Sequence, residues 1–180
     1  NRVALLTTAY LPPIQYFSKL ANYSRVRIEK HDHYSKQTYR NRCHILGPNG
    51  LQHLSIPVHK TFGNHTALKD IRIDYDKQWQ IQHWRAIHTA YKSSPYFMHF
   101  APDLQVFYEN KYVFLLDFNA ALMDWLLQVI GIDVVWRYTE EFVNQEYSNL
   151  DDYRDVIHPK QQFAQPDPAF NAPTYTQVFS

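Results

Sequence analysis

The chain has 180 residues, of which 45% are hydrophobic and 16% aromatic, which excludes a disordered or low-complexity chain and is enough for one substantial core. Lysine and arginine number 18 and the acidic residues 17, so the formal net charge is +1. This balance gives no overall basic field for nucleic acid or an anionic membrane surface, and any anion site must be local. We expect one domain over residues 1–180.

The first thirty residues predict a strand, a helix and a second strand. Residues 3–8 form a short apolar run, residues 14–23 place apolar side chains three and four apart, and residues 25–30 alternate apolar and charged ones. This order permits a parallel strand pair, and ligands usually meet the carboxyl ends of such strands. We therefore place the site where the loops at 9–13 and 31–34 face the segment that follows.

That segment, from Tyr34 to His44, holds the densest set of cations, hydrogen-bond donors and aromatic rings in the chain. Its members are Tyr34, Lys36, Tyr39, Arg40, Asn41, Arg42, Cys43 and His44. Arg40 and Arg42 share a face if the backbone is extended and could then clamp a phosphate, with Lys36 adding a point charge. The alternative is that both arginines pair with carboxylates in a structural network.

Other side chains complete the predicted site. Tyr10, Tyr34 and Tyr39 would stack on a sugar or base, and Asn41 would orient a polar group through its amide. Within residues 47–50, Gly-Pro-Asn-Gly predicts a tight reversal between two strands of a hairpin, and Pro57 favours a strand end there.

The remaining elements alternate between strands and helices. We predict a strand within residues 67–74, a helix capped by Asp76, helices over 96–109 and 116–130, and a strand over 133–138. Beyond Thr139 we expect one or two short helical turns at 151–156 and then an extended, proline-rich end. The fold class is therefore α/β, with a mixed sheet in a single domain.

The helix after Asp76 brings further candidates. His83 could act as a catalytic base, and Trp84 and Tyr91 could contact the substrate, although aromatic residues at helical spacing more often form core. His83 and His88 are five residues apart, which does not place two metal ligands on one helix face, so we expect no metal. With 4 glycines the chain has no glycine-rich phosphate loop, and no cofactor is indicated.

The single cysteine, Cys43, excludes an intramolecular disulfide and is a candidate nucleophile for an acyl intermediate. Its neighbour His44 would point to the opposite face of a strand and is a poor partner. No window approaches the roughly 18 consecutive apolar residues of a membrane span, and no signal peptide is evident, so we expect a cytoplasmic protein.

Several blocks of sequence resemble the WbqC-like family over nearly the whole chain. They are residues 8–17 (TAYLPPIQYF), 34–42 (YSKQTYRNR), 48–50 with 54–58, and Trp79, His83-Trp84, Ala90-Tyr91, 94–97 (SPYF) and 117–119 (DFN). The variants at residues 40–44, 157–160 and 177–179 are most similar to a Bacteroidetes-type subgroup. One departure is Thr7-Thr8-Ala9 before Tyr10, where many members carry Gln-Pro. Many members also continue past the Gln-Val-Phe segment, which implies that this chain lacks a final segment.

The resemblance implies a transferase of bacterial surface-polysaccharide (O-antigen-type) biosynthesis that adds an aminoacyl or acyl group to an activated amino sugar. Its substrate would be a small anion, a nucleotide sugar or sugar phosphate. Two alternatives stay open: a non-catalytic module that binds a nucleotide sugar or a protein, and a transferase or hydrolase that depends on Cys43.

Overall fold

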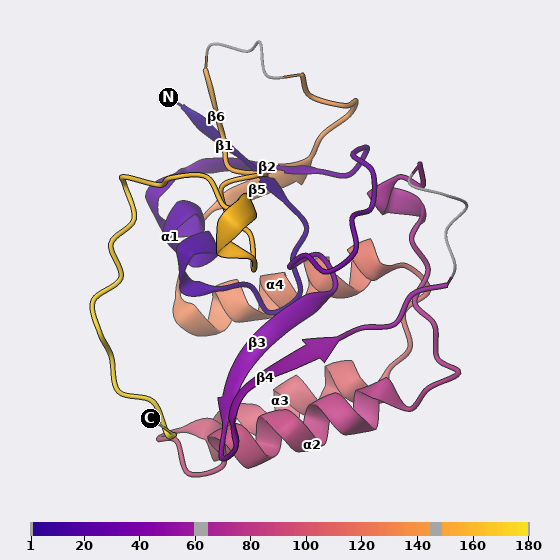
Figure 1. Ribbon diagram of the computed structural model, residues 1–180, viewed down its shortest axis with the longest axis vertical. Helices are drawn as coiled ribbons and strands as arrows, with labels where there is room; N and C mark the ends of the chain where they lie inside the picture. Colours follow the sequence, from indigo (N-terminus) through magenta and orange to yellow (C-terminus); the bar gives the residue numbers. More distant parts are fainter. Residues whose placement is uncertain (1, 60–64, 145–148, 180) are drawn as a thin grey trace.

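Four parallel strands form the main sheet of the computed structural model, which describes residues 2–59, 65–144 and 149–179 (Figure 1). In spatial order these are β5 (Val135–Tyr138), β2 (Arg25–Glu29), β1 (Val3–Thr7) and β6 (Leu150–Asp152). Helix α1 (Ile14–Asn22) connects β1 to β2, and Ala4 pairs with Val26 in a parallel register. The predicted strand, helix and strand at the start of the chain are confirmed.

One face of this sheet carries a continuous apolar core. Because side chains alternate along a strand, Ala4 and Leu6 of β1 share a face with their partners Val26 and Ile28 of β2. All four are buried in one cluster with Tyr16 and Leu20 of α1 and Met123 and Leu127 of α4 (Leu115–Ile130). Two helices therefore cover the same face of the sheet.

A separate two-stranded hairpin pairs β3 (Arg42–Gly47) with β4 (Gly50–Ser55). The predicted reversal is confirmed: Gly50 adopts φ 97°, a left-handed value that glycine tolerates without strain from a Cβ atom. Cys43, Ile45 and Leu54 point from the hairpin into a second core. The α/β class is confirmed, with parallel and antiparallel pairing divided between two sheets.

Helix α4 lies between the sheet and the hairpin in Figure 1. Helices α2 (Trp79–Tyr91) and α3 (Phe97–Glu109) pack against the same hairpin-side core, where the rings of Trp79 and Tyr108 meet Phe118 of α4. The Phe118 and Leu122 side chains of α4 belong to the hairpin-side core. Gly131, at φ 76°, ends this helix as predicted. Within the described ranges, no helix is both long and apolar enough to cross a bilayer.

Three local predictions are wrong. Residues 67–74 contain a short 3₁₀ helix, Leu68–Asp70, and isolated bridges instead of a strand, because Ile71 and Ile73 alternate to reach the core without a ladder partner. Gln78, not Asp76, precedes α2, since the Asp74 carboxylate accepts the Asp76 N–H in a turn before the helix. Residues 150–152 are strand β6, and the turn follows at 154–156.

Candidate functional site

A cavity of about 400 Å³ lies at the carboxyl ends of the parallel strands, where open α/β sheets usually bind ligands. Thr7 ends β1, and the loops after β2 and β6 supply most of the wall. Its polar lining includes Asp32, His33, Tyr39, Arg40, Asp155 and His158. The cavity is thus built from three segments that are distant in the sequence.

Arg40 is the best-buried charged side chain of this lining that keeps an unused donor. Its Nη2 donates to Asp32 Oδ2 at 3.0 Å, whereas its Nε has no hydrogen-bond partner among the described residues. Burial lowers the pKa of Arg40, and the nearby carboxylates of Asp32 and Asp155 only partly oppose this. A further anion beside Arg40 would stabilise its charge.

Thr7, at the end of β1, also has a side-chain donor without a hydrogen-bond partner among the described residues. Thr7 and Arg40 are 9% and 8% exposed. Buried polar atoms in native proteins are nearly always hydrogen-bonded to protein, water or ligand. Both side chains line the cavity, although the two unpartnered atoms are themselves enclosed in the wall.

A buried polar network fixes the wall beside them. The Glu29 carboxylate, fully buried, accepts hydrogen bonds from Thr139 Oγ1 at 2.8 Å and from the backbone N–H groups of His31 and Val143. Arg154 lines the cavity, but its guanidinium donates to Asp152 at 2.7 to 3.1 Å and lies 3.6 Å from Glu29. The charges of Glu29 and Arg154 are therefore already paired with each other and hydrogen-bonded to neighbouring groups of the protein.

The segment 158–167 closes one side of the cavity and is held at both ends. Lys160 Nζ donates to Gln37 Oε1 at 2.7 Å, and Lys19 Nζ lies 2.7 Å from Asp167 Oδ2 in an ion pair whose side chains are 3% and 7% exposed. The Lys160 N–H donates to His158 Nδ1, so in the neutral ring the proton sits on Nε2. His158 is therefore a hydrogen-bond donor through Nε2.

The residues predicted for the site are divided between this cavity and the core. Tyr39 and Arg40 line the cavity. Lys36 is exposed, and Arg42 donates through Nε to Ser55 Oγ on the hairpin. Arg40 lies in a turn and Arg42 in β3, so the extended backbone that a shared clamp requires is not present.

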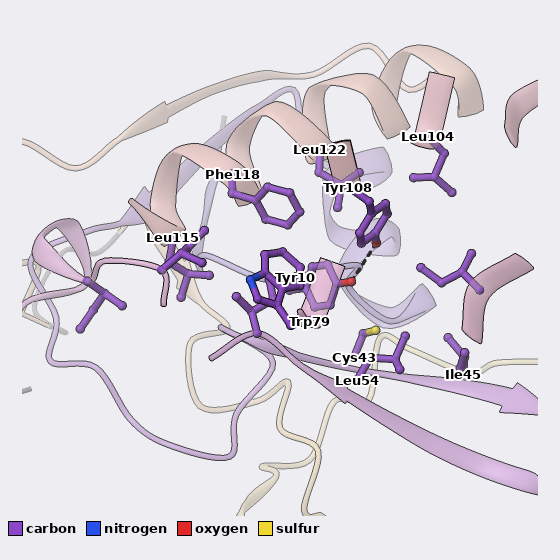
Figure 2. Close-up of a cluster of buried hydrophobic side chains, with 14 of the residues drawn as sticks. Tyr10, Cys43, Ile45, Leu54, Trp79, Leu104, Tyr108, Leu115, Phe118 and Leu122 are labelled. Atoms are coloured by element: carbon purple, nitrogen blue, oxygen red, sulfur yellow. Dashed lines mark hydrogen bonds between the residues drawn. The ribbon is translucent and has the colours of Figure 1, made fainter. Parts of the chain in front are cut away.

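Two of the predicted residues meet in the core. The Tyr10 hydroxyl is 2.9 Å from His83 Nδ1 and 2.8 Å from the Tyr108 hydroxyl. Trp79 and Phe118 pack beside Tyr10 and Tyr108, as Figure 2 shows, and Trp79 also contacts the His83 ring. Burial raises the pKa of Tyr10 and lowers that of His83 to about 4, although a hydrogen bond to the Ser55 backbone favours the charged ring. The chain thus carries a neutral, hydrogen-bonded core cluster at this point.

Cys43 and the other predicted contacts are also largely enclosed. Burial raises the pKa of the Cys43 thiol to about 12, which disfavours the reactive thiolate. Tyr34 is buried in the hairpin-side core, and Asn41 donates to the Ile56 carbonyl at 2.8 Å. Trp84 and Tyr91 are partly buried and pack against that same core.

Sequence reasoning missed several residues of the cavity. Thr7 and His158 were noted only as variants within the family blocks, and Asp155 was given no role. Strand β6, which brings Asp155 and His158 to the sheet, was not predicted. Asp32 and His33 follow β2, in the loop at 31–34 that we expected to face the site. A correct assignment of β6 would have pointed to the loop that contains Asp155.

Comparison with known proteins places the chain in a family. An uncharacterized protein of Mycobacterium tuberculosis, Rv1507c, is 29% identical over 133 residues, which cover 73% of this chain and 57% of the relative. The chain therefore matches little more than half the length of that relative. No solved structure shows significant similarity. The profile of the WbqC-like protein family matches residues 8–167, and the chain belongs to the WbqC-like protein family.

Proposed function

We propose that the cavity binds the anionic group of a sugar phosphate or nucleotide sugar, and that the protein is a transferase of bacterial surface-polysaccharide biosynthesis. The observation that supports this most is the pair of enclosed, unpartnered donors, Arg40 Nε and Thr7 Oγ1, on two side chains that line one cavity. A phosphate oxygen that displaces the atoms covering them can accept from both, and hydrogen bonds that involve charged groups are the stronger ones.

The rest of the lining suits a polyhydroxylated ligand. The carboxylates of Asp32 and Asp155 can accept hydrogen bonds from sugar hydroxyls, and the His158 Nε2–H can donate to a ring or hydroxyl oxygen. Tyr39 and the half-exposed Phe163 add aromatic faces. A volume of about 400 Å³ falls in the range of roughly 300–1,000 Å³ that is usual for small-ligand sites.

The reaction type in this proposal comes from the family resemblance: transfer of an aminoacyl or acyl group to an activated amino sugar. A cytoplasmic location belongs to the same proposal. A mechanism through Cys43 finds no support in the geometry, since the thiol is buried with a raised pKa.

A non-catalytic binding module is the second candidate. It is favoured by the placement of Cys43 and His83 in the core, which leaves the described cavity lining without a preassembled pair of nucleophile and base. Product formation from a donor and an amino-sugar acceptor, followed by mass spectrometry with purified protein, separates the two candidates. Binding without turnover of any tested pair would favour the module.

The anion site itself is tested with Thr7→Val, which removes the hydroxyl and keeps the shape. Because that hydroxyl is unpartnered in the free protein, we expect the free energy of unfolding to rise by about 1 kcal/mol while affinity for sugar phosphates falls. Thermal shifts measure both, since a ligand at 100 times its dissociation constant stabilises by roughly 2.7 kcal/mol.

The matched control is Arg42→Ala, because Arg42 lies on the hairpin and not in the cavity lining. Its ligand-induced thermal shift should equal that of the unmodified protein. A shift that Arg42→Ala abolishes and Thr7→Val preserves would move the anion site to the hairpin and refute the cavity proposal.

A further inference from the structure

We propose that the face of the parallel sheet opposite α1 and α4 docks on an anionic phospholipid surface. The part of this face that β2, β5 and the segment after β5 supply is called the arginine face. It consists of Arg25, Arg27 and Arg137 together with the exposed apolar side chains of Val135 and Phe142. None of these residues lines the cavity, so the inference is independent of the proposed anion site.

The strand register brings the arginines together. Arg25 and Arg27 alternate along β2 with the buried Val26, which packs on the helix side of the sheet, so the two arginines point to the opposite side. Arg27 lies directly opposite Arg137 on β5, and Arg25 lies opposite Val135. All four of these side chains on the opposite side are exposed to solvent.

One exposed arginine without a partner is ordinary, but two arginines opposite each other on neighbouring strands are not. Neighbouring strands lie about 4.8 Å apart, and like charges placed directly opposite each other destabilise the pairing. Within the described ranges no acidic residue forms an ion pair with any of the three, including the exposed Asp133, Glu140 and Glu141 that flank β5. The formal net charge of the chain is +1, so this concentration of positive charge is local and favours an anionic partner.

The carboxylates on the same side of the sheet do not offset this charge. Glu29 lies two residues beyond Arg27 on β2, and Asp152 of β6 pairs with Leu5, the residue of β1 that also pairs with Arg27. Both carboxylates lie within ion-pair distance of Arg154, at 3.6 and 2.7 Å. They are therefore paired with a different arginine.

Exposed apolar side chains border the arginines. Val135 is 59% exposed and Phe142 is 47% exposed. The Val143 N–H donates to Glu29 Oε2 at 3.0 Å, so the segment with Phe142 crosses the same side of the sheet at the end of β2. Arg154 Cζ lies 5.4 Å from the centre of the Phe142 ring and Arg154 also lines the cavity, so the arginine face adjoins the cavity wall. Cations beside exposed apolar side chains suit a bilayer surface, where the charges meet lipid phosphates and the apolar groups enter the acyl boundary.

The shape of the arginine face favours a bilayer over other anions. The arginines stand on the surface of a sheet outside the cavity, whereas sites for small ligands are concave. Two strands of five and four residues cover roughly 17 Å by 10 Å, well below the roughly 800 Å² that each partner buries in a stable protein complex. An anionic bilayer requires no matching shape, and each arginine near it adds attraction.

The test is co-sedimentation with vesicles of phosphatidylglycerol and phosphatidylcholine in equal parts, compared with vesicles of phosphatidylcholine alone. We expect the unmodified protein to bind the anionic vesicles and to be released in high salt, which screens the attraction. Arg27→Gln and Arg137→Gln should each lower the partition coefficient by about fivefold. Phe142→Ser should lower it as well, without a change in net charge.

Arg85→Gln is the matched control, because it removes the same charge from an exposed position on α2. It should bind the anionic vesicles as the unmodified protein does. Arg27→Gln removes a repulsion between like charges, so its free energy of unfolding should not fall. Urea unfolding of Arg27→Gln therefore separates lost binding from lost folding.

Several outcomes would overturn the inference. Equal binding to neutral and anionic vesicles, or equal losses in Arg27→Gln and Arg85→Gln, would show that the arginine face has no specific role. Absence of vesicle binding, together with retention on polyglutamate that Arg27→Gln loses, would assign the face to an acidic protein instead. The proposed anion site stands in each case, since its ligands are tested without vesicles.

Discussion

Protonation of His83 is expected to destabilise the fold in acid. The ring is buried in the core, where Nδ1 meets the Tyr10 hydroxyl, and burial lowers the pKa of His83 from 6.5 to about 4. Above pH 6.5 the ring is neutral in the folded and unfolded chains, and its contribution to stability is complete. As the pH falls toward 4, the unfolded chain binds a proton that the folded chain does not, and stability is lost.

The size of the effect follows from the two pKa values. The difference between 6.5 and about 4, at about 1.4 kcal/mol per pKa unit, corresponds to about 3.5 kcal/mol in full, of which about 3 kcal/mol is lost by pH 4. The assay is urea unfolding at a series of pH values, followed by tryptophan fluorescence.

The decisive variant is His83→Gln, which cannot titrate and retains an amide that can reach the Ser55 backbone. It should be less stable at neutral pH but should lose about 3 kcal/mol less than the unmodified protein on acidification. The exposed His99 provides the control, because His99→Gln should leave the pH dependence unchanged. If the unmodified protein and His83→Gln lost stability in parallel from pH 6.5 to 4, the reasoning from His83 would be refuted.

Three other predictions concern the thiol, the segment 158–167 and the hairpin turn. Cys43 should react with iodoacetamide about a thousandfold more slowly in the folded protein than in the unfolded chain, because burial raises its pKa from 9.0 to about 12; similar rates would refute this burial. Asp167→Ala should lower the free energy of unfolding by about 3 kcal/mol by leaving the buried Lys19 unpaired, whereas Lys160→Ala should cost less than about 1 kcal/mol, and equal losses in urea unfolding would contradict the difference. Gly50→Ala should destabilise by about 1 kcal/mol through its positive φ alone, since no atom lies within 4 Å of an added Cβ; a neutral result would argue against that turn.

Much of the fold was predictable because its signals are local. Helix α4 follows from apolar spacing and ends at Gly131, and the hairpin follows from the turn at residues 47–50. The family resemblance rests on short blocks of sequence and was confirmed over residues 8–167. Strand β6 was missed because Leu-Asp-Asp has no apolar alternation, and its pairing with β1 joins residues almost the whole chain apart.

The candidate site was less predictable from the sequence than the fold. The sequence by itself determined which residue types were available, and it pointed to the segment that contains Arg40 and to the loop after β2, both of which line the cavity. Only the tertiary structure decided that Tyr10 and His83 would be core, because the Tyr10 hydroxyl finds its partners 73 and 98 residues away. It also decided that Thr7, Arg40 and Asp155 would share one cavity, since the parallel sheet brings the ends of β1, β2 and β6 together. Long-range pairing of strands and buried hydrogen bonds leave no local periodicity, and that is the physical reason why the chain alone does not reveal them.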